Sequence, residues 1–229
     1  MISALLIGLG AVAQGITGMG FGLLCAPILI GLFGAAEGVR QVVLLSLLLN
    51  LLFLSREFRL VRPVSALGLL LPALAVTPFL KTVLGRADPR VLLLVAGGLT
   101  VGSAGLLALG LRLPWLRGAV GAGAAGVVSA AMNVAGGLAG PAVALYAVNT
   151  FWPPQAVRPT LQCYGALLNT VTLLSLGFPT LHASQLVALL AGSGVGLLAA
   201  DRMPRTTAQR VVLALAGAGG VMVMARALT

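Results

Sequence analysis

The chain contains the stretch Ala13-Gln-Gly-Ile-Thr-Gly-Met-Gly-Phe-Gly-Leu-Leu-Cys-Ala-Pro27, and its second half contains the related stretch Asn133-Val-Ala-Gly-Gly-Leu-Ala-Gly-Pro141. Each stretch is rich in Gly, lies within apolar sequence and ends in Pro. Gly reaches backbone angles that other residues avoid, so each stretch predicts a break in an apolar helix. An Arg and then an Asn follow each copy at matching places: Arg40 and Asn50, then Arg158 and Asn169. The repetition indicates two halves of similar layout.

The composition is that of a membrane protein. Of the 229 residues, 59% are hydrophobic and 8% are charged, whereas charged residues make up about a quarter of a soluble domain. The apolar runs approach the length of about 20 residues that crosses a bilayer as a helix. Lipid offers the backbone no hydrogen-bond partners, and the alternating strand pattern of a membrane barrel is absent. We therefore expect an all-α polytopic membrane protein. The apolar sequence from Ile2 follows no basic segment and precedes no cleavage site, which favours a first membrane element over a removable signal.

Apolar runs and polar gaps divide the chain into eight expected elements. In the first half, 1–111, these are 2–34, 40–55, 63–80 and 90–111; in the second half, 112–229, they are 117–148, 155–177, 183–200 and 208–227. The elements 2–34 and 117–148 contain the Gly-rich breaks. The gaps between elements contain Pro, which begins or ends helices because it lacks an N–H group.

The broken elements are expected to be re-entrant hairpins. Residues 3–14 would form a helix of about 18 Å, too short for a hydrocarbon core of about 30 Å, and the same holds for 24–34. Hairpins leave three full crossings in each half, and an odd number inverts the second repeat relative to the first. They also place most basic residues on one side, as the positive-inside rule favours. That side would hold Arg56, Arg59, Arg62, Arg112, Arg117, Arg158, Arg202, Arg205 and Arg210, and the other Arg40, Lys81, Arg86, Arg90 and Arg226.

The breaks are also the candidate binding site. An unwound segment leaves backbone N–H groups free, and the start of the next half-helix adds a partial positive charge, so two opposed breaks would attract an anion. The candidate substrate-binding residues are Thr17, Gly18, Gly20, Gly22, Pro27, Asn50, Asn133, Gly136, Gly137, Gly140, Pro141 and Asn169, with Gln14 and Ser129 as further candidate donors. Close helix packing is the alternative explanation of Gly-rich sequence, and we apply it to Gly192–Gly196, Gly217–Gly220 and Gly97–Gly98.

Four polar residues in or beside apolar helices each have two interpretations. Asn50 and Asn169 are expected to face the bundle interior, where each contacts substrate or joins two helices. Arg40 and Arg158 stand near helix starts, which is unfavourable for the helix dipole. They form an entrance that attracts anions, or they extend toward lipid head groups.

The pattern Gly15-x-x-Gly-Met-Gly-Phe-Gly22 with Pro27, and Gly136-Gly-x-x-Gly-Pro141 with Arg158 and Asn169, resembles the TauE/SafE-type sulfite exporters. The resemblance covers essentially the whole chain. It implies a permease of the bacterial cytoplasmic membrane for small anions that often contain sulfur, such as sulfite or an organosulfonate. The implied site comprises Gly18–Pro27 and Asn133–Pro141, with Asn50 and Asn169 nearby. The second break lacks a Gly-x-Gly-Gly run, so the two half-sites are chemically unequal.

A secondary transporter is therefore the leading hypothesis. A passive anion channel, a permease for a small organic acid without sulfur, and a structural subunit are the alternatives. An enzyme is not expected, because Ser129 has no general base in the apolar segments and His182 lies in a loop. We expect no cofactor and no metal, and Cys25 and Cys163 are interpreted as small core residues. The expected partners are a small anion and the lipid bilayer, not nucleic acid, and a homodimer is left open.

Overall fold

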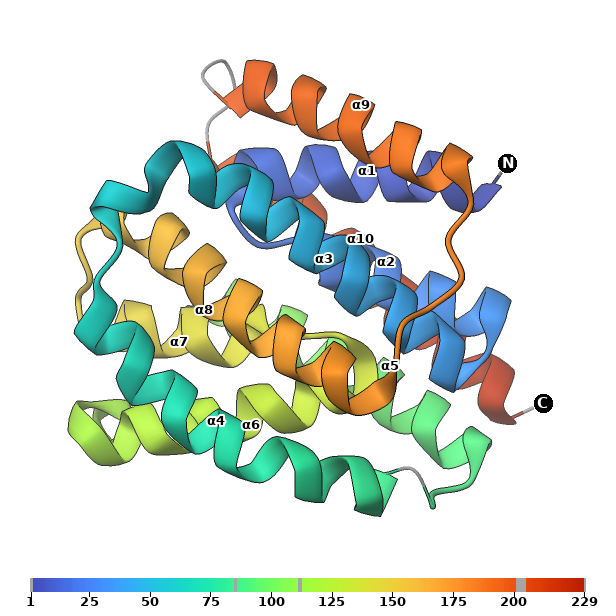
Figure 1. The fold of residues 1–229 in the computed structure, drawn as a ribbon, viewed down its shortest axis with the longest axis horizontal. Coiled ribbons are helices and arrows are strands. Elements are labelled where there is room, and N and C mark those ends of the chain that lie inside the picture. The colour runs from blue at the N-terminus through green and yellow to red at the C-terminus, as the bar shows by residue number, and fades with distance from the viewer. Residues whose placement is uncertain (1, 85, 111–112, 201–204, 229) are drawn as a thin grey trace.

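A computed structural model describes residues 2–84, 86–110, 113–200 and 205–228, and every regular element within them is a helix. The α-helices are α1 Ile2–Thr17, α2 Phe21–Phe33, α3 Ala35–Glu57, α4 Pro63–Leu84, α5 Pro89–Leu109, α6 Gly118–Gly136, α7 Gly140–Asn149, α8 Pro154–Leu176, α9 Ala183–Ala200 and α10 Arg205–Leu228 (Figure 1). Two 3-10 turns, η1 Phe58–Leu60 and η2 Pro114–Leu116, precede α4 and α6.

The helices lie roughly along one common axis, and the two broken segments enter from opposite ends of it. In Figure 1, α1 runs inward from the right-hand end and α2 returns to that end. The helix α6 runs inward from the left-hand end and α7 returns there. The remaining α-helices run along the length of the molecule between these ends (Figure 1). Each break therefore lies at a turn inside the helical bundle.

The helices suit a lipid environment. The segments 35–60, 63–83, 90–109 and 118–136 are long and apolar enough to cross a membrane, and shorter apolar helices cover 3–17, 21–33, 183–199 and 209–225. Large apolar side chains are exposed on the outer surface, among them Val64 at 83% and Val120 at 82%. A soluble protein rarely exposes so much apolar surface. These features support a multi-pass helical membrane protein.

Three expectations from the sequence about element ends and lengths are corrected. The helix α1 continues to Thr17, so its length of about 24 Å exceeds the arm expected from 3–14. The helix α6 is by itself long enough to cross a membrane, whereas α7 has only 10 residues. The helix α3 begins at Ala35, because the chain turns at Gly34 with φ +83°, and Arg40 therefore lies in its second turn instead of at its start. Among the basic residues assigned to the two ends, Arg112 and Arg202 lie outside the described residues, as do the side chains of Arg205 and Arg226.

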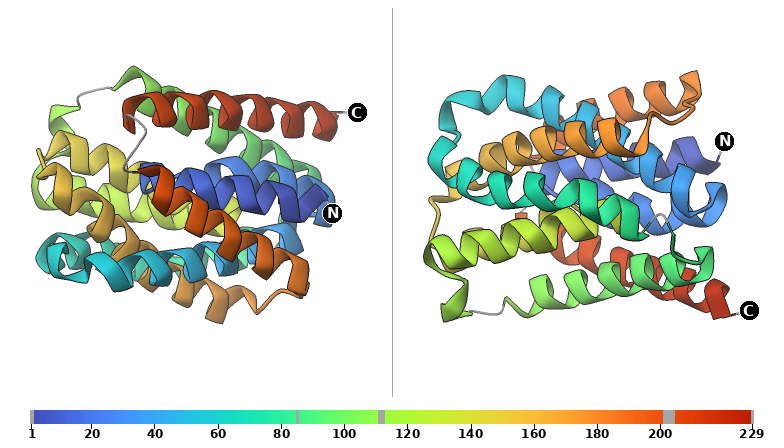
Figure 2. Two further views of the ribbon diagram at one scale, coloured as in Figure 1. Left: turned by 90° about the horizontal axis from the view of Figure 1, so that it is seen from above. Right: turned by 60° about the horizontal axis from the view of Figure 1, so that its bottom comes forward.

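Gly residues allow the helix pairs to approach closely. A Cβ atom on Gly192 of α9 would collide with the Gly8 carbonyl of α1, and one on Gly15 would lie 2.9 Å from Gly196. The helices α5 and α10, side by side in Figure 2, meet at Gly97 and Gly220. Small residues at such contacts are typical of membrane helix packing. The interpretation as close helix packing is confirmed for Gly97, Gly192, Gly196 and Gly220. It does not hold for Gly98, Gly194 and Gly217, where a Cβ would meet no heavy atom within 4 Å.

Candidate functional site

The two breaks have the same local geometry. The chain unwinds between Thr17 and Phe21 and again between Gly136 and Gly140, as the sequence predicts. Gly18 and Gly137 have positive φ angles, +80° and +70°, which residues with a side chain rarely adopt. In each turn the glycine N–H donates to a carbonyl in the preceding helix, Gln14 in the first and Asn133 in the second, at 2.8 Å. Glycine is therefore required at both turns.

Both breaks border one central cavity of about 50 Å³. This volume holds a few water-sized groups, since one water needs about 10–15 Å³ on this measure. The predicted residues that line it are Gly18, Gly20, Gly22, Asn50, Gly137, Gly140, Pro141 and Asn169. The lining also includes Gln14, Ser46, Gln162 and Gly165, together with Met19, Leu23, Leu138, Ala139 and Leu161. None of the described residues that line the cavity carries a formal charge, and side-chain amides supply most of its polar groups.

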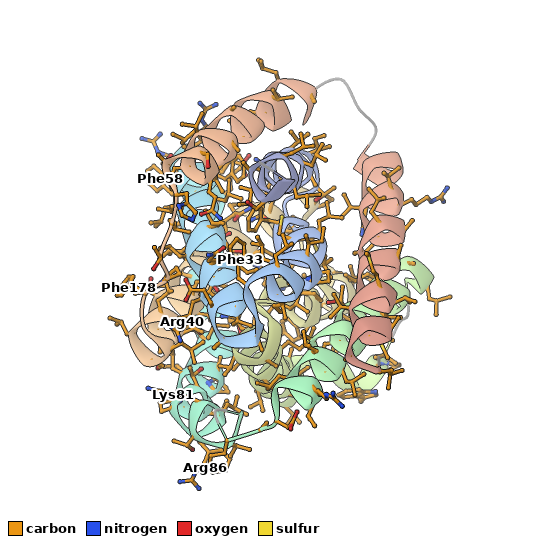
Figure 3. The ribbon with its side chains drawn as sticks, turned by 90° about the vertical axis from the view of Figure 1, so that its right-hand side faces the viewer. Phe33, Arg40, Phe58, Lys81, Arg86 and Phe178 are labelled. Atoms are coloured by element: carbon orange, nitrogen blue, oxygen red, sulfur yellow. The ribbon has the colours of Figure 1, made fainter. Side chains whose placement is uncertain are left out.

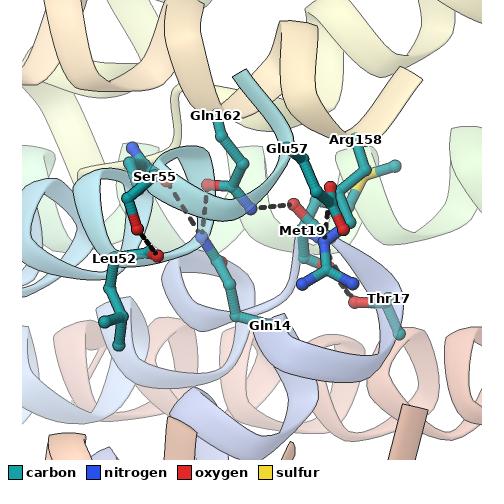
Figure 4. A network of polar contacts seen from close by, with 10 residues as sticks. Gln14, Thr17, Met19, Leu52, Ser55, Glu57, Arg158 and Gln162 are labelled. Carbon is teal, nitrogen blue, oxygen red and sulfur yellow. Dashed lines mark hydrogen bonds and ion pairs between the residues drawn. The ribbon is translucent and has the colours of Figure 1, made fainter. Parts of the chain in front are cut away.

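Gln14 connects the first break to α3 and α8. Its Oε1 accepts the backbone N–H groups of Gly20 at 3.3 Å and Phe21 at 3.1 Å. Its Nε2 donates to Asn50 Oδ1 at 3.0 Å and to Gln162 Oε1 at 3.4 Å (Figure 4). The N–H groups expected to be free at the start of α2 are therefore partly occupied by this side chain. Among the described residues, no side chain is seen to accept a backbone N–H at the start of α7 in the same way.

Gln162 was not among the residues predicted from the sequence to form the site. This buried residue donates its Nε2 to the Gly18 carbonyl at 3.0 Å and so connects α8 to the first break (Figure 4). It follows Arg158 by one helical turn, and Asn169 lies two turns further along the same face. A polar stripe on an apolar helix was the signal that could have identified it.

Four predicted site residues do not line the cavity. Thr17 donates its hydroxyl to the carbonyls of Ala13 at 2.8 Å and Met19 at 2.6 Å, which holds the first turn. Pro27 is buried in α2 and faces Gly219 of α10. The other two are Asn133 and Gly136, which end α6. Thr17 and Asn133 therefore hold the two turns from behind the cavity surface, whereas Pro27 packs toward α10 and Gly136 toward Ala96 of α5.

Asn133 holds the second break in place through α8. Its Nδ2 donates to Asn169 Oδ1 and Thr172 Oγ1, both at 3.0 Å, and its buried Oδ1 has no hydrogen-bond partner among the described residues. Ser129 donates to the Ala139 carbonyl at 2.6 Å. Like Gln14, these side chains fix the break to its neighbours, so neither Asn133 nor Ser129 is free to donate into the cavity.

Arg158 lies against the first break. Its Nε is 3.5 Å from Glu57 Oε2, and its guanidinium lies 5.1 Å from the centre of the Phe53 ring (Figure 4). A Cβ on Gly18 would lie 2.9 Å from Arg158 Cγ. Only 11% of the Arg158 side chain is exposed. A largely buried Arg from the second half of the sequence therefore packs on the break of the first half.

Arg40 is separate from the central cavity. Its Nη1 pairs with Glu37 Oε2 at 3.5 Å, and it lines a second cavity of about 220 Å³ that also includes Lys81. Further along α3, Val42 packs beside Gly137, where an added Cβ would collide with it, and Ser46 lines the central cavity. Each of the two predicted entrance residues pairs with a Glu at 3.5 Å, but Arg158 packs on the first break whereas Arg40 lines the second cavity.

Comparisons of the chain with protein-family models, with curated proteins and with solved structures give no match.

Proposed function

We propose that this protein is a secondary transporter for a small anion, with its substrate site in the central cavity. One observation carries the proposal: two Gly-rich turns that are far apart in the sequence border the same cavity. Broken helices that meet within the bundle are the usual substrate site of secondary transporters. The amides of Gln14, Asn50 and Gln162 supply hydrogen-bonding groups around it.

We further propose that residues 1–111 and 112–229 are two inverted repeats. The opposite directions of α1–α2 and α6–α7 support this (Figure 1). So do the hydrogen bonds from Gln14 to Asn50 and from Asn133 to Asn169, which join residues 36 apart in both halves. Inverted repeats provide two equivalent conformations that open to opposite sides, which is the basis of alternating access.

The expected substrate is an anion. Among the described residues no acidic side chain lines the cavity to repel one, and the start of α7 presents the positive end of a helix dipole. Arg158 lies beside the first break and adds positive potential. The volume of about 50 Å³ favours an anion as small as sulfite over a larger organosulfonate. The resemblance to sulfite exporters supports the same substrate class and a bacterial cytoplasmic membrane.

Counterflow in proteoliposomes tests the proposal. Protein reconstituted with unlabelled sulfite inside should accumulate labelled sulfite transiently, and the rate should saturate with concentration. Flux that rises linearly without saturation would indicate the passive channel instead. Accumulation of a small carboxylate but not of sulfite would indicate a permease for an organic acid without sulfur.

A variant pair separates transport from a structural role. Gly18→Leu should abolish counterflow in protein that still inserts and remains monodisperse, because the new side chain enters the site beside Arg158. Gly98→Leu is the control, since a Cβ there meets no heavy atom within 4 Å. A structural subunit would show no sulfite-dependent flux in the parent protein.

A further inference from the structure

We propose that the second cavity is a separate binding site for an oxyanion that is joined to an apolar chain. This outer cavity is defined by Arg40 and Lys81 together with apolar walls that include Val39, Leu92, Val134 and Leu176. Its volume of about 220 Å³ is larger than that of the central cavity, from which its lining is entirely distinct. The inference does not depend on the proposed transport function.

The outer cavity is positively charged. Arg40 and Lys81 come from different helices, α3 and α4, and Figure 3 shows both at the same end of the molecule. Glu37 is shared between Arg40, at 3.5 Å, and the backbone N–H of Thr180, at 2.9 Å. Within the described part of the chain no carboxylate lies within 4.0 Å of the Lys81 ammonium. Two cations with one shared acid leave positive charge for a ligand.

Helix position alone does not explain this pair. Lys81 stands in the last turn of α4, where a cation is favourable for the helix dipole. Arg40 stands in the second turn of α3, where the dipole offers a cation nothing favourable, and Glu37 is its carboxylate partner at 3.5 Å. Arg40 and Lys81 line the same cavity with that single carboxylate, so an anion that contacts both would balance the remaining positive charge. Arg and Lys both donate charge-assisted hydrogen bonds to oxyanions.

The walls indicate the rest of the ligand. Apart from the two cations, the residues that line the outer cavity are Ala, Val and Leu. A bare inorganic anion gains nothing from such walls, whereas a hydrocarbon chain is removed from water by them. An acidic phospholipid and a soluble alkyl sulfonate both combine an oxyanion with a hydrocarbon chain. The chemistry is shared, and the source is decided by experiment.

The test measures ligand-induced thermal stabilisation of purified protein in neutral detergent. The proteins are the parent, Arg40→Gln with Lys81→Gln, and the control Arg56→Gln with Arg59→Gln, which removes equal charge from exposed positions at the end of α3 and in η1. The soluble probes are hexanesulfonate and methanesulfonate. The lipid probes are mixed micelles that contain phosphatidylglycerol or phosphatidylcholine.

Two results support the inference. In the first result, hexanesulfonate stabilises the parent and the control at lower concentration than methanesulfonate does. The half-saturating concentration of hexanesulfonate then rises about tenfold or more in the Arg40/Lys81 variant, as loss of a charged hydrogen bond predicts. Alternatively, only phosphatidylglycerol stabilises, with the same dependence on Arg40 and Lys81, which identifies a lipid source. If neither ligand distinguishes the variant from the Arg56/Arg59 control, the inference is wrong. If the double variant does not fold, Lys81→Gln at its exposed position replaces it, and Lys81→Arg serves as the rescue. Lys81→Gln should raise the half-saturating ligand concentration and Lys81→Arg should restore it; equal values for the two variants would contradict the inference.

Discussion

Gln14 and Asn133 make the same two contacts in the two halves of the chain. The backbone carbonyl of each accepts the N–H of a glycine with positive φ at 2.8 Å. The side-chain amide of each donates to the side chain of an Asn 36 residues later at 3.0 Å. Gln14 is longer by one methylene, and its Oε1 reaches the start of α2. Asn133 Oδ1 has no hydrogen-bond partner among the described residues. The two breaks are therefore alike in backbone and unlike in capping.

Gln14→Glu should separate the structural role of this residue from substrate binding. The carboxylate retains acceptors for the N–H groups of Gly20 and Phe21, but it loses the donor to Asn50 and places a negative charge at the central cavity. At pH 8 we expect folded protein whose KM for sulfite rises at least tenfold, because like charges repel strongly in a site of low dielectric constant. Counterflow rates and the unfolding midpoint check this. A KM equal to that of the parent would show that no anion approaches Gln14.

Gln14→Leu should act mainly on stability. The substitution removes the partner of two backbone N–H groups at the start of α2, those of Gly20 and Phe21. It also removes the donor to the side-chain Oδ1 of Asn50. Each unsatisfied buried group costs about 1–3 kcal/mol. We expect a lower midpoint of thermal unfolding than for Gln14→Glu. Equal midpoints for the two variants would mean that the cap contributes nothing.

Gly18→Ala should be more harmful than Gly34→Ala, although both positions have almost the same φ, +80° and +83°. Both substitutions strain the backbone, since a residue with a side chain at such a positive φ costs about 1–3 kcal/mol, and Gly34, with ψ 165°, lies in a region where almost only glycine is found. A Cβ on Gly18 also lies 2.9 Å from Arg158 Cγ, whereas one on Gly34 meets nothing within 4 Å. We expect both variants to lose stability but only Gly18→Ala to lose counterflow. Equal loss of counterflow would assign the effect to backbone strain alone.

Asn133→Ala and Asn169→Ala should affect different properties. Asn133 is completely buried and does not line the cavity, so its removal should lower the free energy of unfolding by about 1–3 kcal/mol while KM changes little. Asn169 accepts from Asn133 and also lines the cavity, so its removal should lower stability and raise KM. Chemical denaturation and sulfite counterflow measure the two quantities. A large KM effect of Asn133→Ala would place its amide in the site after all.

Gly192→Ala should destabilise the protein and Gly194→Ala should not. A Cβ on Gly192 collides with the Gly8 carbonyl of α1, whereas one on Gly194 meets no heavy atom within 4 Å. Ala is also favoured over Gly within a helix by up to about 1 kcal/mol, so Gly194→Ala should be neutral or stabilising. Thermal unfolding of the two variants, two residues apart on α9, provides the comparison. Equal unfolding midpoints for the two variants would mean that α1 and α9 do not pack closely at Gly192.

The helical architecture and the breaks were predictable because they depend on local chemistry. Apolar runs with few charges predict helices in lipid, and the Gly-rich turns at Gly18 and Gly137 lie within the stretches that end in Pro27 and Pro141. The start of α3 was placed too late, at Arg40, although Glu37 also belongs to the helix. They form an ion pair one turn apart, within the helix.

The contacts between the halves were not predictable from one sequence. Nothing in the pattern around Arg158 specifies that its side chain packs on Gly18, or that Gln162 donates to the Gly18 carbonyl. Both depend on how α8 crosses the first break, a tertiary property. The same reason separates Arg40 from Arg158, which the repeat suggests are equivalent. Arg40 lines the outer cavity, whereas Arg158 packs on the first break beside Glu57.

Arg158 and Glu57 offer the last test, because opposite charges in one pair should shift anion affinity in opposite directions. Glu57→Gln leaves the Arg158 charge without its partner at 3.5 Å and should lower KM for sulfite severalfold. Arg158→Gln should raise KM about tenfold, and Arg158→Lys should recover part of it, since Lys retains the charge but not the planar stacking on Phe53. The difference between the charge variants should shrink at high salt. If both neutral variants shift KM in the same direction, the pair acts only by holding the end of α3 against α8, and the positive potential at the first break does not act on the substrate.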